Sequence, residues 1–299
     1  MHETKEPGSA QSVTSNAGAQ PVQPRKPRKG IYVLPNLFTL AALFGGFYSI
    51  VMAMNGRFEA AAVGVFCAMV LDSLDGRVAR MTNTQSAFGE QMDSLSDMVS
   101  FGAAPALIAY EWALRPLGRW GWIAAFVYCS CAALRLARFN VNTAVVDKRY
   151  FQGMPSPAAA ALVAGFIWLT SALLVSHRDV PIFGDVIALF GGHPGSREDL
   201  SWIMFAITLF AGLTMVTNIP YYSFKDAGAA KSVPFITLVV IALLFALVSI
   251  EPATMLFLIF VLYSISGYVI YAWRRSKGQH ASIVATSTDE PDERGLHHD

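Results

Sequence analysis

The chain has 299 residues, of which 54% are hydrophobic and 14% are charged, and its formal net charge is +1. A soluble domain carries roughly 25% charged residues, so this composition excludes an ordinary soluble protein and indicates an integral membrane protein. The small net charge gives no sign of a nucleic-acid partner, and none is predicted.

Apolar windows recur along the chain. A membrane-spanning helix needs about 20 mainly apolar residues. Eight windows meet or approach this length: 34–54, 58–80, 89–113, 120–139, 156–176, 201–217, 232–250 and 252–273. Because the sequence shows no alternation typical of strands, the predicted fold is an all-α integral membrane protein, a bundle of about eight transmembrane helices.

Lysine and arginine gather on one side of this predicted arrangement. An even number of crossings places both termini on the same side of the membrane. Cytoplasmic loops are enriched in Lys and Arg, so this side and both termini are predicted to be cytoplasmic. The basic positions on it are the N-terminal PRKPRKG, Arg80, the segment 135–149, Lys225, Lys231, Arg274, Arg275 and Lys277.

Three segments outside the apolar windows have a composition of their own. Residues 1–29 and 278–299 lack an apolar run that could bury a core, so they are predicted to be disordered tails. The stretch PIFGDVIALFGG, residues 181–192, is predicted to lie at the lipid surface. The chemistry is therefore expected among the helices.

Two neighbouring predicted helices carry aspartates near the turn that joins them. Asp72 and Asp75 are three residues apart on the first helix, and Asp93 and Asp97 are four apart on the second. Each pair therefore shares one helix face, and an antiparallel helix pair would bring the two acidic faces together. Small residues on the same faces either permit close helix packing or leave room for a ligand. These residues are Gly76, Ala79 and Gly89.

Four carboxylates beside hydrocarbon require compensating positive charge. Even one charge at the centre of a spanning helix costs about 2.5–3.5 kcal/mol on insertion scales. Arg80 is the one basic residue on the two acidic faces, so an ion pair within the protein is not expected to neutralise the cluster. Oxygen ligands without His or Cys favour Mg²⁺, Mn²⁺ or Ca²⁺ over zinc. The pattern therefore predicts a site for divalent cations, with enough carboxylates for two closely spaced ions.

The spacing of these residues resembles a family signature. Residues 72–97 fit D-x2-D-G-x2-A-R-x8-G-x3-D-x3-D at every fixed position, which is the pattern of the CDP-alcohol phosphotransferase family. Four further segments resemble the phosphatidylserine synthase branch of that family: LPNLFTLAALFGG in the first helix, LRLARFNV (134–141), YFQGMPSPAAA (150–160) and NIPYYSFK (218–225). The resemblance covers nearly all of residues 34–225.

This resemblance implies an enzyme that transfers the phosphatidyl group of CDP-diacylglycerol to L-serine and releases CMP. It implies two divalent ions, Mg²⁺ or Mn²⁺, and a catalytic base, Asp97. The metal ligands that it implies are Asp72, Asp75, Asp93 and Asp97. The residues that it implies for binding the CDP-linked donor are Asp72, Gly76, Ala79, Arg80 and Gly89.

The acceptor alcohol is less well defined by the sequence. Arg135, Arg138 and Asn140 end the fourth predicted helix and are candidates for binding it, since arginine recognises carboxylates bidentately. The arginines equally fit membrane anchors or contacts to the donor phosphates. Glycerol 3-phosphate, inositol phosphate or choline remain alternative acceptors, because Lys148 and Arg149 could complete a phosphate pocket. A divalent-cation transporter is a remote alternative. The acids of a transporter would line a path across the membrane, whereas the aspartates here cluster at one end of the helices.

The predicted organisation follows from these assignments. Residues 1–29 form a cytoplasmic tail, 30–225 a six-helix catalytic core, 226–277 two accessory transmembrane helices, and 278–299 a second tail. The accessory helices would serve packing, contact with membrane lipids, or a homodimer interface. The enzyme is predicted to be a multi-pass protein of a bacterial-type inner membrane with its active site facing the cytoplasm.

Overall fold

A computed structural model of the chain describes residues 33–82, 84–142, 150–176, 200–222 and 235–277. The two predicted tails, the segment 181–192, and the basic residues Lys148, Arg149, Lys225 and Lys231 lie outside the described residues. The described part is mainly helical, so the predicted fold class, an all-α membrane protein, is confirmed.

The helices begin and end close to the predicted windows. They are α1 (Val33–Met54), α2 (Phe58–Met81), α3 (Ala87–Asp97), α4 (Ala104–Ala109), α5 (Arg119–Asn142), α6 (Ser156–Ser176), α8 (Ser201–Val216), α9 (Phe235–Ile250) and α10 (Pro252–Ser276). Within the described residues, 4 helices are long and apolar enough to cross a membrane, namely those over 34–54, 119–141, 156–173 and 252–276. The total number of crossings remains a prediction.

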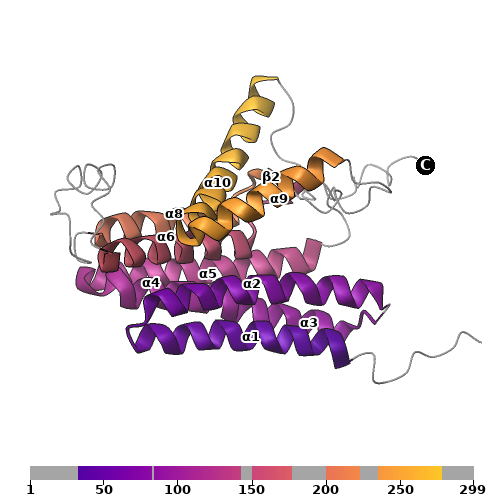
Figure 1. Cartoon of the computed structure of the whole chain (residues 1–299), viewed down its shortest axis with the longest axis horizontal. Coiled ribbons are helices and arrows are strands. Elements are labelled where there is room, and N and C mark those ends of the chain that lie inside the picture. Colours follow the sequence, from indigo (N-terminus) through magenta and orange to yellow (C-terminus); the bar gives the residue numbers. More distant parts are fainter. Residues whose placement is uncertain (1–32, 83, 143–149, 177–199, 223–234, 278–299) are drawn as a thin grey trace, which may run out of the picture.

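Most of the long helices run side by side along the long axis of the molecule (Figure 1). α1 packs against α2, α2 against α6, and α8 against both α5 and α6. α10 instead crosses this bundle and rises steeply from it (Figure 1). It approaches α6 where Phe257 faces Gly165, and it meets the segment after α8 where Gly267 faces Tyr221.

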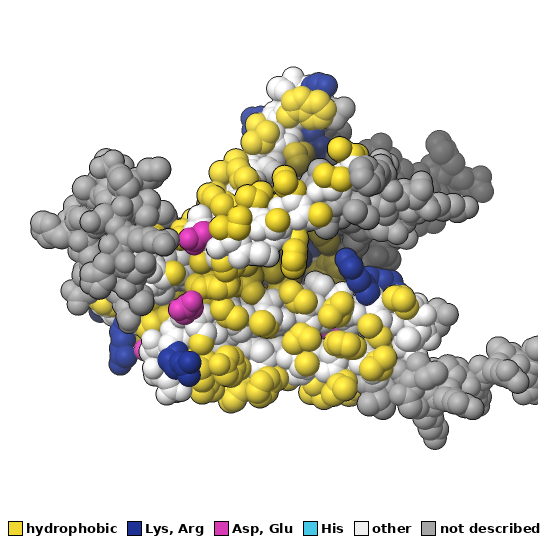
Figure 2. Space-filling view, in the orientation of Figure 1, with side chains coloured by type: hydrophobic (Ala, Val, Ile, Leu, Met, Phe, Trp, Pro, Cys, Tyr) yellow, Lys and Arg dark blue, Asp and Glu magenta, His cyan; other side chains and the backbone are white. Residues whose placement is uncertain are grey.

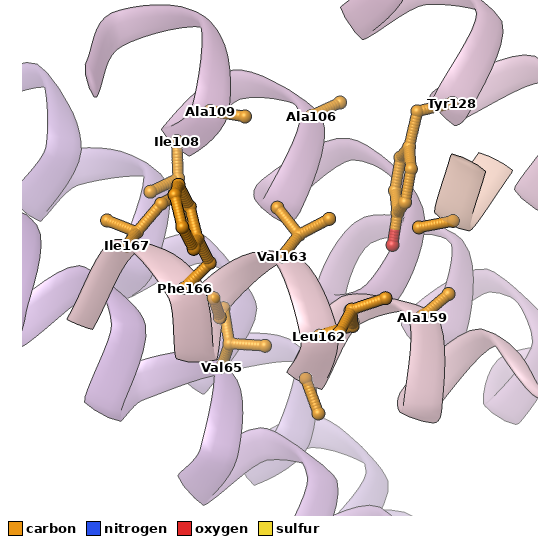
Figure 3. Packing of buried hydrophobic residues seen from close by; sticks show 14 of the residues in the cluster. Val65, Ala106, Ile108, Ala109, Tyr128, Ala159, Leu162, Val163, Phe166 and Ile167 are labelled. Carbon is orange, nitrogen blue, oxygen red and sulfur yellow. The ribbon is translucent and has the colours of Figure 1, made fainter. Parts of the chain in front are cut away.

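The core of the bundle is built around α6. Its alanines at 158–161 are buried, and such small side chains let neighbouring helices approach closely. The next turns of α6 contribute larger residues to a cluster shared with α2, α4 and α5 (Figure 3). That cluster includes Leu162, Val163, Phe166 and Ile167 of α6 with Val65, Ile108 and Tyr128. α6 therefore fixes the relative positions of the helices that carry the candidate site.

The predicted span 89–113 is not one uniform α-helix. π-helical turns occupy Met98–Ala103 and Tyr110–Leu114, on either side of α4. Tyr128 of α5, which is buried, donates its hydroxyl to the carbonyl of Phe101 at 3.1 Å within the first π turn. Such wide turns shift the register of side chains before and after them and occur often at functional sites. Here the shift comes directly after Asp97.

A short antiparallel ribbon joins two loops at one end of the bundle. β1 (Tyr150–Gln152) pairs with β2 (Pro220–Tyr222), with Phe151 opposite Tyr221. The prediction that the fold lacks strands is wrong here, because strands this short show no alternation. Gly153 follows β1 with φ +71°, and a side chain there would collide with the carbonyl of Met215. The ribbon is therefore held close to the end of α8.

The outer surface suits a lipid environment. Apolar side chains cover much of the face in Figure 2, and the charged side chains visible there lie toward the ends of helices. At the end of α10, Lys277 places its ammonium 4.0 Å from the centre of the Trp273 ring. Tryptophan and lysine together are typical of the membrane–water boundary.

Candidate active site

The predicted site residues gather at one end of the bundle. α2 and α5 end there, and α1, α3 and α6 begin there, so residues far apart in sequence become neighbours (Figure 1). Ser86 caps the first turn of α3 by accepting a hydrogen bond from the backbone of Gly89 at 3.0 Å. This cap fixes where the acidic face of α3 starts relative to α2.

Three of the aspartates meet as the helix spacing predicts. Asp72, Asp75 and Asp93 each offer a carboxylate oxygen within 4.8 Å of the other two. Asp75 is 6% exposed, and the other two are half-buried. Three carboxylates at this spacing can hold a hard divalent cation.

Asp97 adjoins this group, and its negative charge adds to the repulsion among the carboxylates. Its charge interacts with those of Asp72, Asp75 and Asp93. One carboxylate oxygen of Asp97, Oδ1, and the same atom of Asp93 are buried without a hydrogen-bond partner in the described structure. Orphaned buried oxygens are costly unless something satisfies them, and a divalent cation does so. The residues present therefore fit the predicted metal.

Thr39, which was not among the predicted site residues, orients this cluster. The hydroxyl of Thr39, on α1, donates to Oδ2 of Asp75 at 2.8 Å and is also 3.2 Å from the carbonyl of Pro35. Thr39 is 4% exposed, so water does not compete for this bond. The available signal was a polar residue inside the apolar stretch LPNLFTL, since polar residues within spanning helices are usually functional.

Replacing Thr39 by valine should weaken metal activation without unfolding the protein. Valine keeps the shape of threonine but cannot orient the Asp75 carboxylate, and loss of such a partner typically costs 10–100-fold in metal affinity or activity. We expect the Mn²⁺ concentration for half-maximal activity to rise by about that factor, with recovery at high Mn²⁺. Thr170→Val is the matched control, since the Thr170 hydroxyl bonds only within α6. Equal Mn²⁺ dependence in both variants would contradict this role.

The small residues of the motif have different surroundings. A methyl group at Gly76 would have Arg80 Nη1, at 3.8 Å, as its nearest neighbour, so the space beside Gly76 is open. At Gly89 it would lie 3.2 Å from Ser86 Oγ and 3.3 Å from Asn36 Oδ1. Gly89 therefore lies in a close contact with these two side chains, whereas Gly76 and the exposed Arg80 border open space. Ala79 is half-buried on the same helix.

α5 brings a cation to the aspartates. Arg135 is 8% exposed, its Nη1 donates to Ser156 Oγ of α6 at 2.8 Å, and its charge interacts with Asp97. Its Nε is buried without a hydrogen-bond partner in the described structure. Arg135 was predicted as a candidate for acceptor binding, but its interaction with the aspartates was not expected, because only the charges on the two motif helices were considered. No described Lys or Arg forms an ion pair with the four aspartates, so the cluster still needs further cations.

The other two candidates for acceptor binding are placed differently. The Arg138 guanidinium donates at 3.1–3.3 Å to an acceptor set at the end of α8 and beside the ribbon. These acceptors are the carbonyls of Gln152, Met215, Val216 and Thr217 and the side chain of Asn218. Asn140 donates to Ser94 Oγ, next to Asp93, at 3.0 Å. The Arg138 guanidinium is thus bonded to the protein backbone, whereas Asn140 is bonded to Ser94 of α3.

The fold and the site together define a class: a helical membrane protein with a cluster of carboxylates at one end of its bundle. Residues 32–214 match the family described as CDP-alcohol phosphatidyltransferase, and the chain belongs to this family. The predicted resemblance is confirmed, and the chain is accordingly a phosphatidyltransferase.

Several relatives carry the name CDP-diacylglycerol--serine O-phosphatidyltransferase. The protein of Helicobacter pylori (strain ATCC 700392 / 26695) is 37% identical over 219 residues, which cover 73% of this chain and 84% of the relative. The protein of Methanocaldococcus jannaschii is 35% identical over 159 residues, covering 53% of this chain and 74% of the relative. The protein of Saccharomyces cerevisiae is 38% identical over 149 residues, covering 45% and 53%.

Proposed function

We propose that this chain transfers the phosphatidyl group of CDP-diacylglycerol to L-serine, giving phosphatidylserine and CMP. The observation that carries this proposal is the cluster of Asp72, Asp75 and Asp93, with a buried cation, Arg135, whose charge interacts with that of Asp97. A zwitterionic alcohol needs a cation for its carboxylate and a base for its hydroxyl, and these two residues offer both. The names of the relatives support the same donor and acceptor.

Asp72, Asp75, Asp93 and Asp97 would hold two divalent ions, Mg²⁺ or Mn²⁺. When bound, such ions neutralise the pyrophosphate of the donor and stabilise the charge that develops on the departing CMP. The open space beside Gly76, with Arg80 at its border, suits the nucleotide part of the donor. Thr39 keeps the Asp75 carboxylate in one orientation.

Asp97 would act as the general base. It would accept the proton of the serine hydroxyl as that oxygen attacks the donor phosphorus, and the bond from phosphorus to the CMP oxygen would break. A base must lie within hydrogen-bond reach of the proton that it takes, and one oxygen of the Asp97 carboxylate could take that proton while the other contacts a cation. Its interaction with the other aspartates supports a position beside the donor phosphates.

Arg135 would bind the serine carboxylate through Nε, the donor that the described structure leaves unpaired. A phosphorylated acceptor would need several free cations at this place. Arg138 is already bonded to carbonyls of the protein. Among the described residues, the charges around Arg135 therefore support a carboxylate over a phosphate dianion.

The site would face the cytoplasm in a bacterial-type inner membrane. Arg77, Arg80, Arg135 and Arg138 all lie at the end of the bundle that carries the aspartates, and basic residues favour the cytoplasmic side. Both tails would lie on that side too.

The proposal is tested with the purified full chain in detergent, CDP-diacylglycerol and Mn²⁺. Parallel reactions receive L-serine, glycerol 3-phosphate, inositol phosphate or choline, and CMP and the lipid product are quantified. Serine alone should give both products, and EDTA should abolish them until Mn²⁺ or Mg²⁺ is restored in excess. Turnover of another acceptor in place of serine would overturn the acceptor assignment, and full activity in EDTA would overturn the metal site.

A further inference from the structure

The last helix, α10, reaches the acceptor side of the site. It covers Pro252–Ser276, beyond residues 32–214 that match the family, and the sequence analysis predicted an accessory role for it. Its described contacts, however, are specific and polar as well as apolar.

Tyrosines dock α10 on the ribbon. Tyr221 of β2, which is fully buried, donates its hydroxyl to the carbonyl of Ser264 at 3.0 Å, and Tyr263 donates to the carbonyl of Tyr222 at 3.3 Å. The rings of Tyr221 and Tyr263 lie 5.5 Å apart. A methyl group at Gly267 would collide with the Tyr221 ring, so this contact requires glycine. α10 and β2 are therefore fitted to each other at several points.

The ribbon in turn is bonded to α5. β2 pairs with β1, and the carbonyl of Gln152 in β1 accepts from Arg138 Nη2 at 3.3 Å. The chain then passes through Gly153 to Ser156, which accepts from Arg135 at 2.8 Å. A continuous set of contacts thus joins α10 to the two arginines.

Arg135 is held from α6, at the end of the segment that follows the ribbon. Its Nη1 donates to Ser156 Oγ, while its Nε has no partner in the described structure. Tyr263 bonds to the other strand of the ribbon, at the carbonyl of Tyr222. The position of Ser156, and with it that of the guanidinium, therefore depends on a ribbon that α10 supports.

We propose that α10 completes the acceptor side of the active site, with Tyr263 as a positioning residue that holds the ribbon and thereby Ser156, the partner that keeps the Arg135 guanidinium toward the acceptor carboxylate. This inference rests on the proposed function, because it takes serine as the molecule that Arg135 binds. It assigns a role in the affinity for the acceptor to residues beyond 32–214, the range that matches the family.

The test compares Tyr263→Phe with the wild type in steady-state assays of the full chain. Loss of one hydrogen-bonding hydroxyl should raise the KM for serine about three- to tenfold. The kcat at saturating serine and the KM for CDP-diacylglycerol should stay within about twofold of the wild type, because the donor site is untouched. Tyr271→Phe makes the same change about two helical turns further along α10 and should leave all three constants unchanged.

Gly267→Ala tests the docking of α10 independently. Alanine favours the helix itself, so any defect arises from the collision with Tyr221 rather than from helix loss. It too should raise the KM for serine, whereas Leu262→Ala, at an exposed position of α10, should not. An unchanged serine KM in both Tyr263→Phe and Gly267→Ala would overturn the inference while leaving the proposed function intact. Absence of serine turnover in the wild type would instead overturn the proposed function.

Discussion

Asp97→Asn should lower kcat by about 10²–10⁴-fold, the usual contribution of a general base. The amide keeps the size of the side chain and an oxygen that can still contact a cation, but it cannot take the proton of the serine hydroxyl. Binding of CDP-diacylglycerol and the Mn²⁺ dependence should therefore change far less than kcat. Single-turnover assays with saturating substrates separate these quantities.

Glu111→Gln is the control for this change. Glu111 lies beyond α4 and pairs with Arg115 at 3.2 Å, away from the aspartate cluster. It should retain wild-type kcat. Should Asp97→Asn keep more than a tenth of the wild-type kcat, Asp97 is not the base.

Arg135→Leu should reduce kcat/KM for serine by about 10–100-fold, since hydrogen bonds to charged groups contribute about 1.5–3 kcal/mol. The change removes the buried cation beside Asp97 and the proposed partner of the serine carboxylate. Arg135→Lys should recover only part of the loss, because lysine lacks the planar fork of donors. The KM for each substrate, measured separately, checks this prediction.

Arg138→Leu tests whether Arg138 binds substrate or stabilises the fold. The Arg138 guanidinium bonds to the end of α8 and to β1, so its loss should lower the thermal midpoint of the protein and affect both substrates alike. A serine-specific rise in KM for Arg138→Leu, without a change for Arg135→Leu, would reverse the two assignments.

The sequence predicted the helices and the meeting of the motif aspartates because both follow from local rules. Apolar length marks a membrane-crossing helix, and a spacing of three or four residues places Asp72 and Asp75 on one face. The short turn between α2 and α3 then left little freedom in how the two acidic faces could meet. The structure accordingly brings Asp93 to within 4.8 Å of that pair.

The remaining features depend on contacts between distant segments. Thr39 is 36 residues from Asp75, and Ser156 is 21 residues from Arg135, so no local pattern connects them. The hydrogen bonds from Arg138 to carbonyls could not be predicted either, because every residue has a backbone carbonyl and no residue type marks the ones that accept. The ribbon likewise pairs loops more than 60 residues apart, and α10 docks on it through hydrogen bonds across 41 and 43 residues.

The most direct test of this account is to locate Mn²⁺ by anomalous diffraction from crystals of the full chain grown with the ion. The account predicts anomalous peaks at the carboxylates of Asp72, Asp75 and Asp93, within the roughly 2.0–2.6 Å range of oxygen ligands to hard divalent cations. Diffraction that shows no peak there, or shows the ion bound elsewhere in the chain, would contradict the assignment of these aspartates as the metal site.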